Sequence, residues 1–380
     1  MSGMAQETSI QGRWDDYVLY SGNDVAAFWQ QRLLSLAGRL LVIVGRGFDP
    51  RMCDGIAALI EAGLTSDTDI RVISYDEGSE SPSHRQSNLA GDNWVRFQAM
   101  CAAAHLPLSE MPIDMWSQDG RLVGPVGARD LFESDALTAF SDVIVDISAL
   151  PRALYFPLLA KLLHLADERH PNPLNLHVLV SEHPILDRSI HDEGVEESAR
   201  YLPNFLGEAD MQATAGLPLI WVPLLGPGQL AHMQHVVELV APAQVCPVLP
   251  SPALDPRSAD ELLLEYRQFL FDELGIEPRS VMYASESSPF EVYRQLRRLV
   301  LQYRRALAPL GGCKAVLSVH STKLMSIGAL LAAYELKTEG IRLGVADVAA
   351  HGYSMVDEPK IAATSSRLFE LWITGECYAE

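Results

Sequence analysis

Cysteine is scarce in this chain and never closely paired. The number of cysteines is odd and no C-x-x-C motif occurs, so neither a disulfide scaffold nor a zinc ribbon is expected. The first residues also lack a basic segment followed by an apolar core, which is the mark of a secretory signal. These absences favour a reducing, cytoplasmic location. The five cysteines are Cys53, Cys101, Cys246, Cys313 and Cys377.

Long apolar runs and an excess of positive charge are also absent. Charge or proline interrupts the most apolar stretches, as Arg46 does after Leu40 and Pro223 does after Trp221, so no transmembrane helix is expected. The formal net charge is −20 at pH 7. That charge argues against binding nucleic acid or an anionic membrane over the whole surface, but it leaves room for a small local pocket for an anion.

Several catalytic motifs are missing. No G-x-x-x-x-G-K-[ST] loop for nucleotide phosphates and no G-x-S-x-G esterase turn occurs. The segment 45–47 begins like a dinucleotide-binding fingerprint, but Pro50 replaces its third glycine and Asp49 would lie beside the pyrophosphate. No cofactor is therefore predicted. No metal is predicted either: His232, His235 and Glu238 could share one helix face, but no cysteine or second histidine pair is placed to complete a zinc shell.

What the chain does have is a regular alternation of apolar, β-branched segments with helix-length segments. Hydrophobic residues make up 48% of it and charged residues 21%, enough to bury large cores. The alternation predicts βαβ units, and hence an α/β fold of two tandem Rossmann-like domains, each a parallel sheet with helices on both faces. We place the first domain at 39–205 and the second at 206–380, with 1–38 as an N-terminal packing arm.

Parallel sheets of this kind bind ligands where their strands end. Five predicted strands end in turns of small or polar residues, after Val44, Ile147, Leu225, Ala284 and Val319. We therefore predict a pocket lined by these five turns. In the first half of the chain, the candidate ligand contacts by topology are Gly45, Arg46, Gly47, Arg51 and Ser148.

The stretch 314–331 is the most distinctive. Its apolar run ends at Val319 and an Ala- and Leu-rich segment follows, which predicts a buried strand leading into a helix. Ser321 occupies the expected N-cap, with Thr322 and Lys323 in the first turn. Backbone N–H groups, hydroxyls and an ammonium would then face one point and suit an anion or nucleotide, since a first-turn lysine otherwise opposes the helix dipole. Alternatively, Ser321 only caps the helix and Lys323 extends into solvent.

Residues 318–329 resemble the final motif of CARF domains and of the related SAVED domains. In those families a Rossmann-like fold ends in a [ST]-x-x-[ST]-K-x-M type of turn that contacts a cyclic oligonucleotide, and SAVED proteins look like two CARF-like units in one chain. The resemblance covers about a dozen residues, with Val319-His320 in place of two glycines. It implies ligand contacts by Ser318, Ser321, Thr322, Lys323 and Met325.

Three hypotheses follow for the function. The leading one is a cytoplasmic regulatory or sensor protein that binds a phosphate-bearing nucleotide, a cyclic oligonucleotide being one form, and acts through a protein partner. The second is an enzyme acting on a nucleotide or phosphosugar, with His320, Asp146 or His183 in acid–base catalysis, although Asp146 could simply hydrogen-bond to its neighbouring turn. The third is a ligand-free structural subunit of a larger complex, with antiviral defence as one setting.

Overall fold

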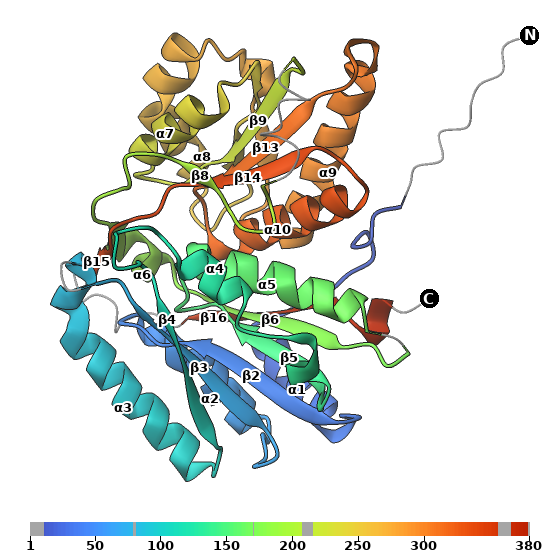
Figure 1. Cartoon of the computed structure of the whole chain (residues 1–380). Helices are drawn as coiled ribbons and strands as arrows, with labels where there is room; N and C mark the ends of the chain where they lie inside the picture. The colour runs from blue at the N-terminus through green and yellow to red at the C-terminus, as the bar shows by residue number, and fades with distance from the viewer. Residues whose placement is uncertain (1–10, 79–80, 170, 207–215, 356–365, 379–380) are drawn as a thin grey trace, which may run out of the picture.

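The computed structural model describes residues 11–78, 81–169, 171–206, 216–355 and 366–378. In this part of the chain, two largely parallel sheets each carry helices on both faces (Figure 1). The predicted fold class, a tandem pair of Rossmann-like α/β units, is confirmed.

The first sheet is parallel at its centre and antiparallel at one edge. Its strand order is β4-β3-β2-β5-β6-β16-β1, in which the first five strands run parallel and β16 and β1 run antiparallel to their neighbours. The strands are β1 (Val18–Ser21), β2 (Arg39–Gly45), β3 (Asp69–Asp76), β4 (Leu108–Asp114), β5 (Phe140–Asp146), β6 (Asn175–Glu182) and β16 (Arg367–Thr374).

The second sheet has the order β12-β11-β9-β13-β14-β8, with β10 paired to β9. Its strands are parallel except for the short edge strand β8. A small separate sheet pairs β7 (Ile190–Asp192) with β15 (Tyr353–Met355). The strands of the second sheet are β8 (Arg200–Tyr201), β9 (Leu219–Leu224), β10 (Gln244–Val245), β11 (Val248–Pro250), β12 (Met282–Ala284), β13 (Lys314–Val319) and β14 (Leu343–Asp347).

Both units order their parallel strands in the same way. With the two-residue strand β10 left out and the rest counted along the chain, the order across each sheet is third, second, first, fourth, fifth: β4-β3-β2-β5-β6 in one and β12-β11-β9-β13-β14 in the other. The order therefore reverses between β2 and β5 and again between β9 and β13. At such a reversal the connections leave toward opposite faces of the sheet and open a crevice at the carboxyl ends of the strands.

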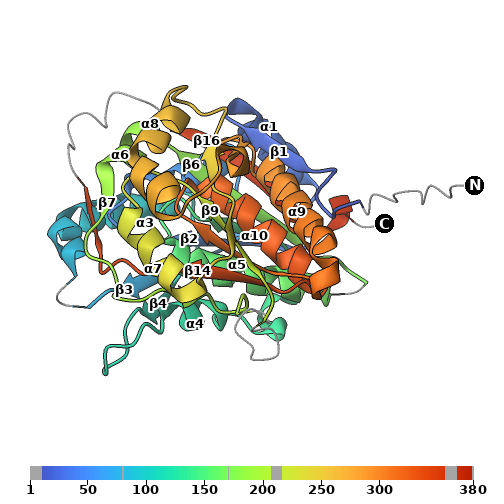
Figure 2. The same cartoon turned by 90° about the horizontal axis from the view of Figure 1, so that it is seen from above.

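The helices form the other layers of the molecule. In the first unit, α1, α2 and α3 cover the outer face of the sheet, while α4 and α5 cover the face toward the second unit. In the second unit, α9 and α10 cover the face toward the first unit, and α7 and α8 cover the outer face (Figures 1 and 2). The helices are α1 (Asn23–Leu34), α2 (Asp54–Glu61), α3 (Ser87–Ala103), α4 (Gly124–Arg129), α5 (Arg152–Asp167), α6 (Pro184–Ser189), α7 (Leu230–Val240), α8 (Ser258–Glu265), α9 (Pro289–Ala306) and α10 (Lys323–Thr338).

The two units meet through α5 and α10. Both helices are apolar almost all round, as expected for helices enclosed on every side. They occupy the same place in their units, each following the fourth parallel strand. The hydroxyl groups of Tyr155 and Ser326, each the fourth residue of its helix, lie 2.5 Å apart in a hydrogen bond. Equivalent positions of the two helices are therefore in direct contact.

The predicted domain boundaries are wrong for three segments. The strand β16, inside the predicted second domain 206–380, lies between β6 and β1 in the first sheet. Conversely, β8, inside the predicted first domain 39–205, pairs with β14 of the second. The predicted packing arm 1–38 supplies β1 and α1 to the first unit. Pairing between strands far apart in the sequence leaves no local signal, and the predicted junction borders 207–215, outside the described residues.

Close packing of α10 against α9 depends on Gly328. A Cβ at this position would lie 2.3 Å from the Pro289 carbonyl oxygen and 2.6 Å from Val292 Cβ, both on α9. We expect Gly328→Ala to lower the free energy of unfolding by about 1–3 kcal/mol through overpacking, as measured by urea denaturation. The control is Gly91→Ala in α3, where a Cβ meets nothing within 4 Å and should stabilise the helix by about 1 kcal/mol. Equal effects of the two substitutions would contradict this packing.

Candidate functional site

A cavity of about 870 Å³ lies between the two units. All four turns at the two reversals of strand order contribute lining residues. These are Phe48 after β2, Ala149 after β5, Gly226 after β9 and His320 after β13. Glu286, after β12, also lines the cavity. A Cβ at position 226 would lie 1.9 Å from the His320 carbonyl oxygen, so only glycine lets these two turns approach. The predicted pocket at the five strand ends is therefore observed.

The helix start after β13 differs from the prediction by one residue. Thr322, not Ser321, is the N-cap: its backbone is extended and its Oγ1 accepts a hydrogen bond from Met325 N at 3.4 Å. The Ser321 hydroxyl is thus not used for capping. It is buried, with no hydrogen-bond partner among the described residues, and Ser321 lines the cavity. Thr322 and Met325 line it as well.

Lys323 is the first residue of α10 and lies inside the cavity rather than in bulk water. Its Nζ donates to the carbonyl oxygen of Leu150, in the turn after β5, at 3.2 Å. Burial lowers the pKa of the ammonium and the positive charge of Arg51 adds to this, while three nearby carboxylates oppose it. An ammonium has three N–H donors, so two remain for a ligand. The carboxylates are those of Asp49, Asp187 and Glu182.

Arg51 lines the cavity too, but carboxylates already match its charge. Two of its nitrogens bind the Asp49 carboxylate, at 2.7 Å for the shorter contact, and Nη1 donates to Asp187 at 2.6 Å. The pKa of Arg51 is raised by these partners despite its burial. Asp49 also accepts from Arg51 N and caps the short 3-10 helix that begins at Pro50, where a helix start was predicted. Arg51 therefore chiefly links Asp49 and Asp187 within the cavity wall.

The other candidates of the first predicted turn do not line the cavity. Arg46 lies over the ring of Trp94, 4.7 Å from its centroid, and pairs with Glu110 at 3.1 Å. Gly45 and Gly47 are needed for packing. A Cβ at position 45 would lie 2.6 Å from Leu150 Cδ2, and one at position 47 would lie 3.0 Å from the Tyr75 hydroxyl.

Ser148 and Asp146 are buried outside the cavity, where they fix the end of β5. Ser148 Oγ accepts from Ser181 N at 2.8 Å, and Ser148 N donates to Asp146 Oδ1 at 2.9 Å. Burial raises the pKa of Asp146 to about 7. Its Oδ2 has no partner among the described residues and would lie 2.1 Å from a Cβ at position 55 of α2. Of the two predicted roles for Asp146, the hydrogen bond to its own turn is the one observed.

His320 lines the cavity and rests on a buried network. Ser318 Oγ accepts from Trp221 Nε1 at 2.9 Å and lies 2.9 Å from His320 Nε2. The serine hydroxyl has a second lone pair and one O–H, so it can pair with either tautomer of His320. Burial lowers the pKa of His320 well below its usual value, and the positive charges of Arg152 and His232 contribute. His320 is therefore a neutral imidazole.

His183, the remaining acid–base candidate, is not a lining residue. Its Nδ1 accepts from Leu186 N at 3.2 Å and caps α6. Ser318 also lies behind the cavity wall and reaches the cavity only through His320.

Two lining residues, Arg152 and Glu182, were not among the sequence candidates. Arg152 begins α5 as Lys323 begins α10, and its Nη1 is buried without a partner among the described residues. Its Nε lies 3.9 Å from Asp347, the last residue of β14. Glu182 is the last residue of β6, the equivalent strand, and acts on the pKa of Lys323. Arg152 of the first unit therefore lies near Asp347 of the second, and Lys323 of the second unit lies near Glu182 of the first.

Sequence signals for these two residues exist in hindsight. Pro151-Arg152 opens a helix directly after an apolar strand, which is the arrangement that singled out Lys323. Glu182 ends a strand that is buried throughout, and a carboxylate in such a place is costly unless it is paired. Superposing the two halves by strand order, rather than by residue identity, would have paired Arg152 with Lys323.

Comparison with protein-family models and with curated proteins found no match. Among solved structures, similarity is found to TrmN from Thermus thermophilus (13% identity, 47% of this chain and 44% of that chain, TM-score 0.21). Similarity is also found to A-type ketoreductases from a modular polyketide synthase (14% identity, 86% of this chain and 82% of that chain, TM-score 0.19). A third similar structure is the Streptomyces sp. SF2575 glycosyltransferase SsfS6 complexed with thymidine diphosphate (12% identity, 77% of this chain and 78% of that chain, TM-score 0.16). The aligned part is less than half of TrmN. At such TM-scores the similarity says nothing about what this chain does.

Two further properties concern only the part of the chain that the structure describes. No group of three or more His, Cys, Asp or Glu side chains is arranged there to hold a metal ion. Of the helices there, none combines the length and the apolar character that crossing a bilayer requires.

Glu182 should make stability depend on pH. Burial and the negative charge of Asp187 raise its pKa from 4.5 to about 8 in the folded chain. The unfolded chain loses the proton at lower pH, so the stability from this group is present below pH 4.5 and lost as the pH rises to about 8. We expect Glu182→Gln to gain stability relative to wild type across this window, by a few kcal/mol at about pH 8 to 9.

Melting temperatures of both proteins from about pH 5 to pH 9 measure this effect. The matched control is Glu110→Gln, a half-exposed glutamate outside the cavity that should follow wild type. Parallel curves for wild type and Glu182→Gln would show that Glu182 ionises normally.

Proposed function

We propose that the chain is a regulatory protein that binds a phosphate-bearing small molecule of the nucleotide class between its two units and passes the bound state to a protein partner. The cavity carries the proposal, because it is lined at both reversals of strand order and has Lys323 at one helix start and Arg152 at the other. Its volume of about 870 Å³ is within the range of small-molecule sites.

The start of α10 supplies the features that an anion needs. The helix has 16 residues, so its start presents the positive end of a sizeable dipole and backbone N–H groups that the helix itself does not use, of which Thr322 takes Met325 N. Ser321 offers a hydroxyl with no partner among the described residues, and Lys323 offers the N–H donors that Leu150 does not take. A phosphate bound here would replace part of the stabilisation that Asp49, Asp187 and Glu182 now give to Lys323.

A regulatory role is supported by the way the units share the site. Lys323 of the second unit bonds to Leu150 of the first, and Arg152 of the first lies near Asp347 of the second. A ligand that engages Lys323 and Arg152 changes both contacts, and therefore the relative position of the units that a partner would sense. The resemblance to CARF and SAVED domains favours a cyclic oligonucleotide as the ligand and antiviral defence as a setting.

We place the protein in the cytoplasm. The five cysteines are free thiols, four of them buried, and free thiols are characteristic of reducing compartments.

His320 and Glu182 favour a second candidate function, an enzyme acting on a nucleotide or phosphosugar. A neutral imidazole and a carboxyl group with a raised pKa line the same cavity, as an acid–base pair would. Turnover of a nucleotide that His320→Ala abolishes while binding persists would support this function. Absence of turnover across a broad nucleotide panel would count against it.

Replacing Lys323 tests the proposed site directly. We expect ATP, GTP or a cyclic oligoadenylate to raise the melting temperature of wild type, and Lys323→Ala to weaken the affinity by about tenfold or more, as expected for loss of a charged hydrogen bond. Isothermal titration calorimetry gives the affinities.

Lys337→Ala is the matched control, since Lys337 lies on the same helix but outside the cavity and donates to the Asn204 carbonyl. It should bind like wild type. Equal affinities for wild type and Lys323→Ala would remove Lys323 from the site. If no nucleotide binds and no small molecule is released from the purified native protein, the chain is a structural subunit instead.

A further inference from the structure

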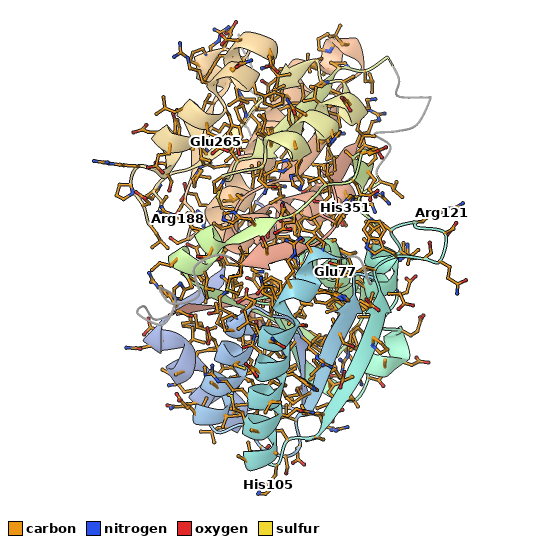
Figure 3. The ribbon with its side chains drawn as sticks, turned by 90° about the vertical axis from the view of Figure 1, so that its left-hand side faces the viewer. Glu77, His105, Arg121, Arg188, Glu265 and His351 are labelled. Atoms are coloured by element: carbon orange, nitrogen blue, oxygen red, sulfur yellow. The ribbon has the colours of Figure 1, made fainter. Side chains whose placement is uncertain are left out.

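One part of the cavity wall is acidic and has no role in holding an anion. Glu261 and Glu265 come from α8, and Glu286 follows β12, all in the second unit. Across from them, Arg188 of the first unit pairs with Asp255 at 2.6 Å. Figure 3 shows Glu265 in the upper unit and Arg188 below it on the same side of the molecule.

The cavity as a whole has more negative than positive side chains. Eight Asp and Glu residues line it, against four Arg and Lys residues. Arg51 is matched by Asp49 and Asp187, and Arg188 by Asp255. Five acidic side chains and two cations remain, and of the five Glu182 keeps its proton up to about pH 8. A ligand that is anionic throughout would be repelled by most of this wall, so the wall calls for a ligand with a second kind of group.

Glu182 is the carboxylate that most needs a partner. Only 7% of it is exposed, it lines the cavity, and its Oε1 has no hydrogen-bond partner among the described residues. A buried acceptor without a donor is costly. A hydrogen-bond donor on a ligand would remove this cost, which makes Glu182 independent support for a bound group at the acidic wall.

The neighbouring carboxylates are positioned by the backbone and keep acceptor capacity. Glu286 Oε2 accepts from Leu254 N at 2.9 Å, and Glu265 Oε1 accepts from Gly228 N at 2.8 Å. These bonds hold the side chains at the cavity edge. In each case the other carboxylate oxygen can still accept, because an ionised carboxylate has about four lone-pair sites.

We infer that the cavity takes a ligand with two chemically different ends: an anionic group at Lys323, and a group rich in O–H or N–H donors that binds Glu182 and the acidic wall. This inference rests on the proposed function and specifies its ligand class. Vicinal sugar hydroxyls and the amino group of a nucleobase both supply such donors. Inorganic phosphates supply only the anionic end.

Calorimetry with defined probes tests this inference on the full chain. The probes are ATP, inorganic triphosphate, 2′-deoxy-ATP, 3′-deoxy-ATP and purine riboside triphosphate, which lacks the 6-amino group. The variants are Glu182→Ala and, as a control, Glu110→Ala outside the cavity. A melting curve establishes that each variant is folded. Glu182→Gln, which keeps the shape and one acceptor oxygen, replaces Glu182→Ala if the latter does not fold.

We expect Glu182→Ala to weaken ATP by about tenfold, the loss of a hydrogen bond to a buried group, and to leave inorganic triphosphate within about twofold of wild type. Glu182→Gln should weaken ATP to a smaller extent. Wild type should also prefer ATP over at least one analogue by about tenfold, and the variant should lose that preference. If the lost preference is the one for ATP over a deoxy analogue, the donors that bind Glu182 are sugar hydroxyls. If it is the one for ATP over purine riboside triphosphate, the donor is the 6-amino group.

Two results would overturn the inference. If ATP and triphosphate bind wild type but Glu182→Ala weakens both equally or neither, Glu182 does not bind a donor group, while the proposed anion site at Lys323 stands. If ATP, GTP, a cyclic oligoadenylate and triphosphate all fail to bind wild type, the proposed nucleotide function and the inference fall together.

Discussion

The packing of α5 against α10 is the contact on which the rest of the structure depends. Each helix follows the fourth parallel strand of its sheet, and their fourth residues, Tyr155 and Ser326, hydrogen-bond to each other. Two parallel sheets joined in this way turn their carboxyl ends toward one shared space. The cavity, the approach of Lys323 to Leu150 and the position of Arg152 all follow from this arrangement, so a ligand there contacts both units at once.

Charge in the cavity is balanced locally rather than overall. Arg51 is neutralised by two carboxylates and serves the wall, whereas Lys323 is held by one carbonyl oxygen and by carboxylates that also act on other groups. Glu182 keeps an oxygen without a partner in the described part of the chain. A ligand competes with weakly held groups of this kind at little cost, because it replaces incomplete interactions instead of breaking complete ones.

The sequence alone predicted the fold class, most of the central strands and the strand-end turns that line the cavity, because apolar segments of strand length and turns of small residues are local signals. It did not predict that β16 returns to the first sheet, since pairing across long sequence distances leaves no local mark. It placed the helix cap at Ser321 instead of Thr322, within the uncertainty of any helix end. Arg152 and Glu182 were missed although each has a local signal, because only the facing of the two units shows that both signals belong to one site.

A crystal structure of the chain grown with ATP would test the central claim most directly, that the cavity between the units is the ligand site. The account predicts ATP in the cavity, with a phosphate oxygen within hydrogen-bonding distance of Lys323 Nζ and the nucleoside toward Glu182. ATP bound elsewhere, or an empty cavity with Lys323 still on the Leu150 carbonyl oxygen at saturating ATP, would contradict it.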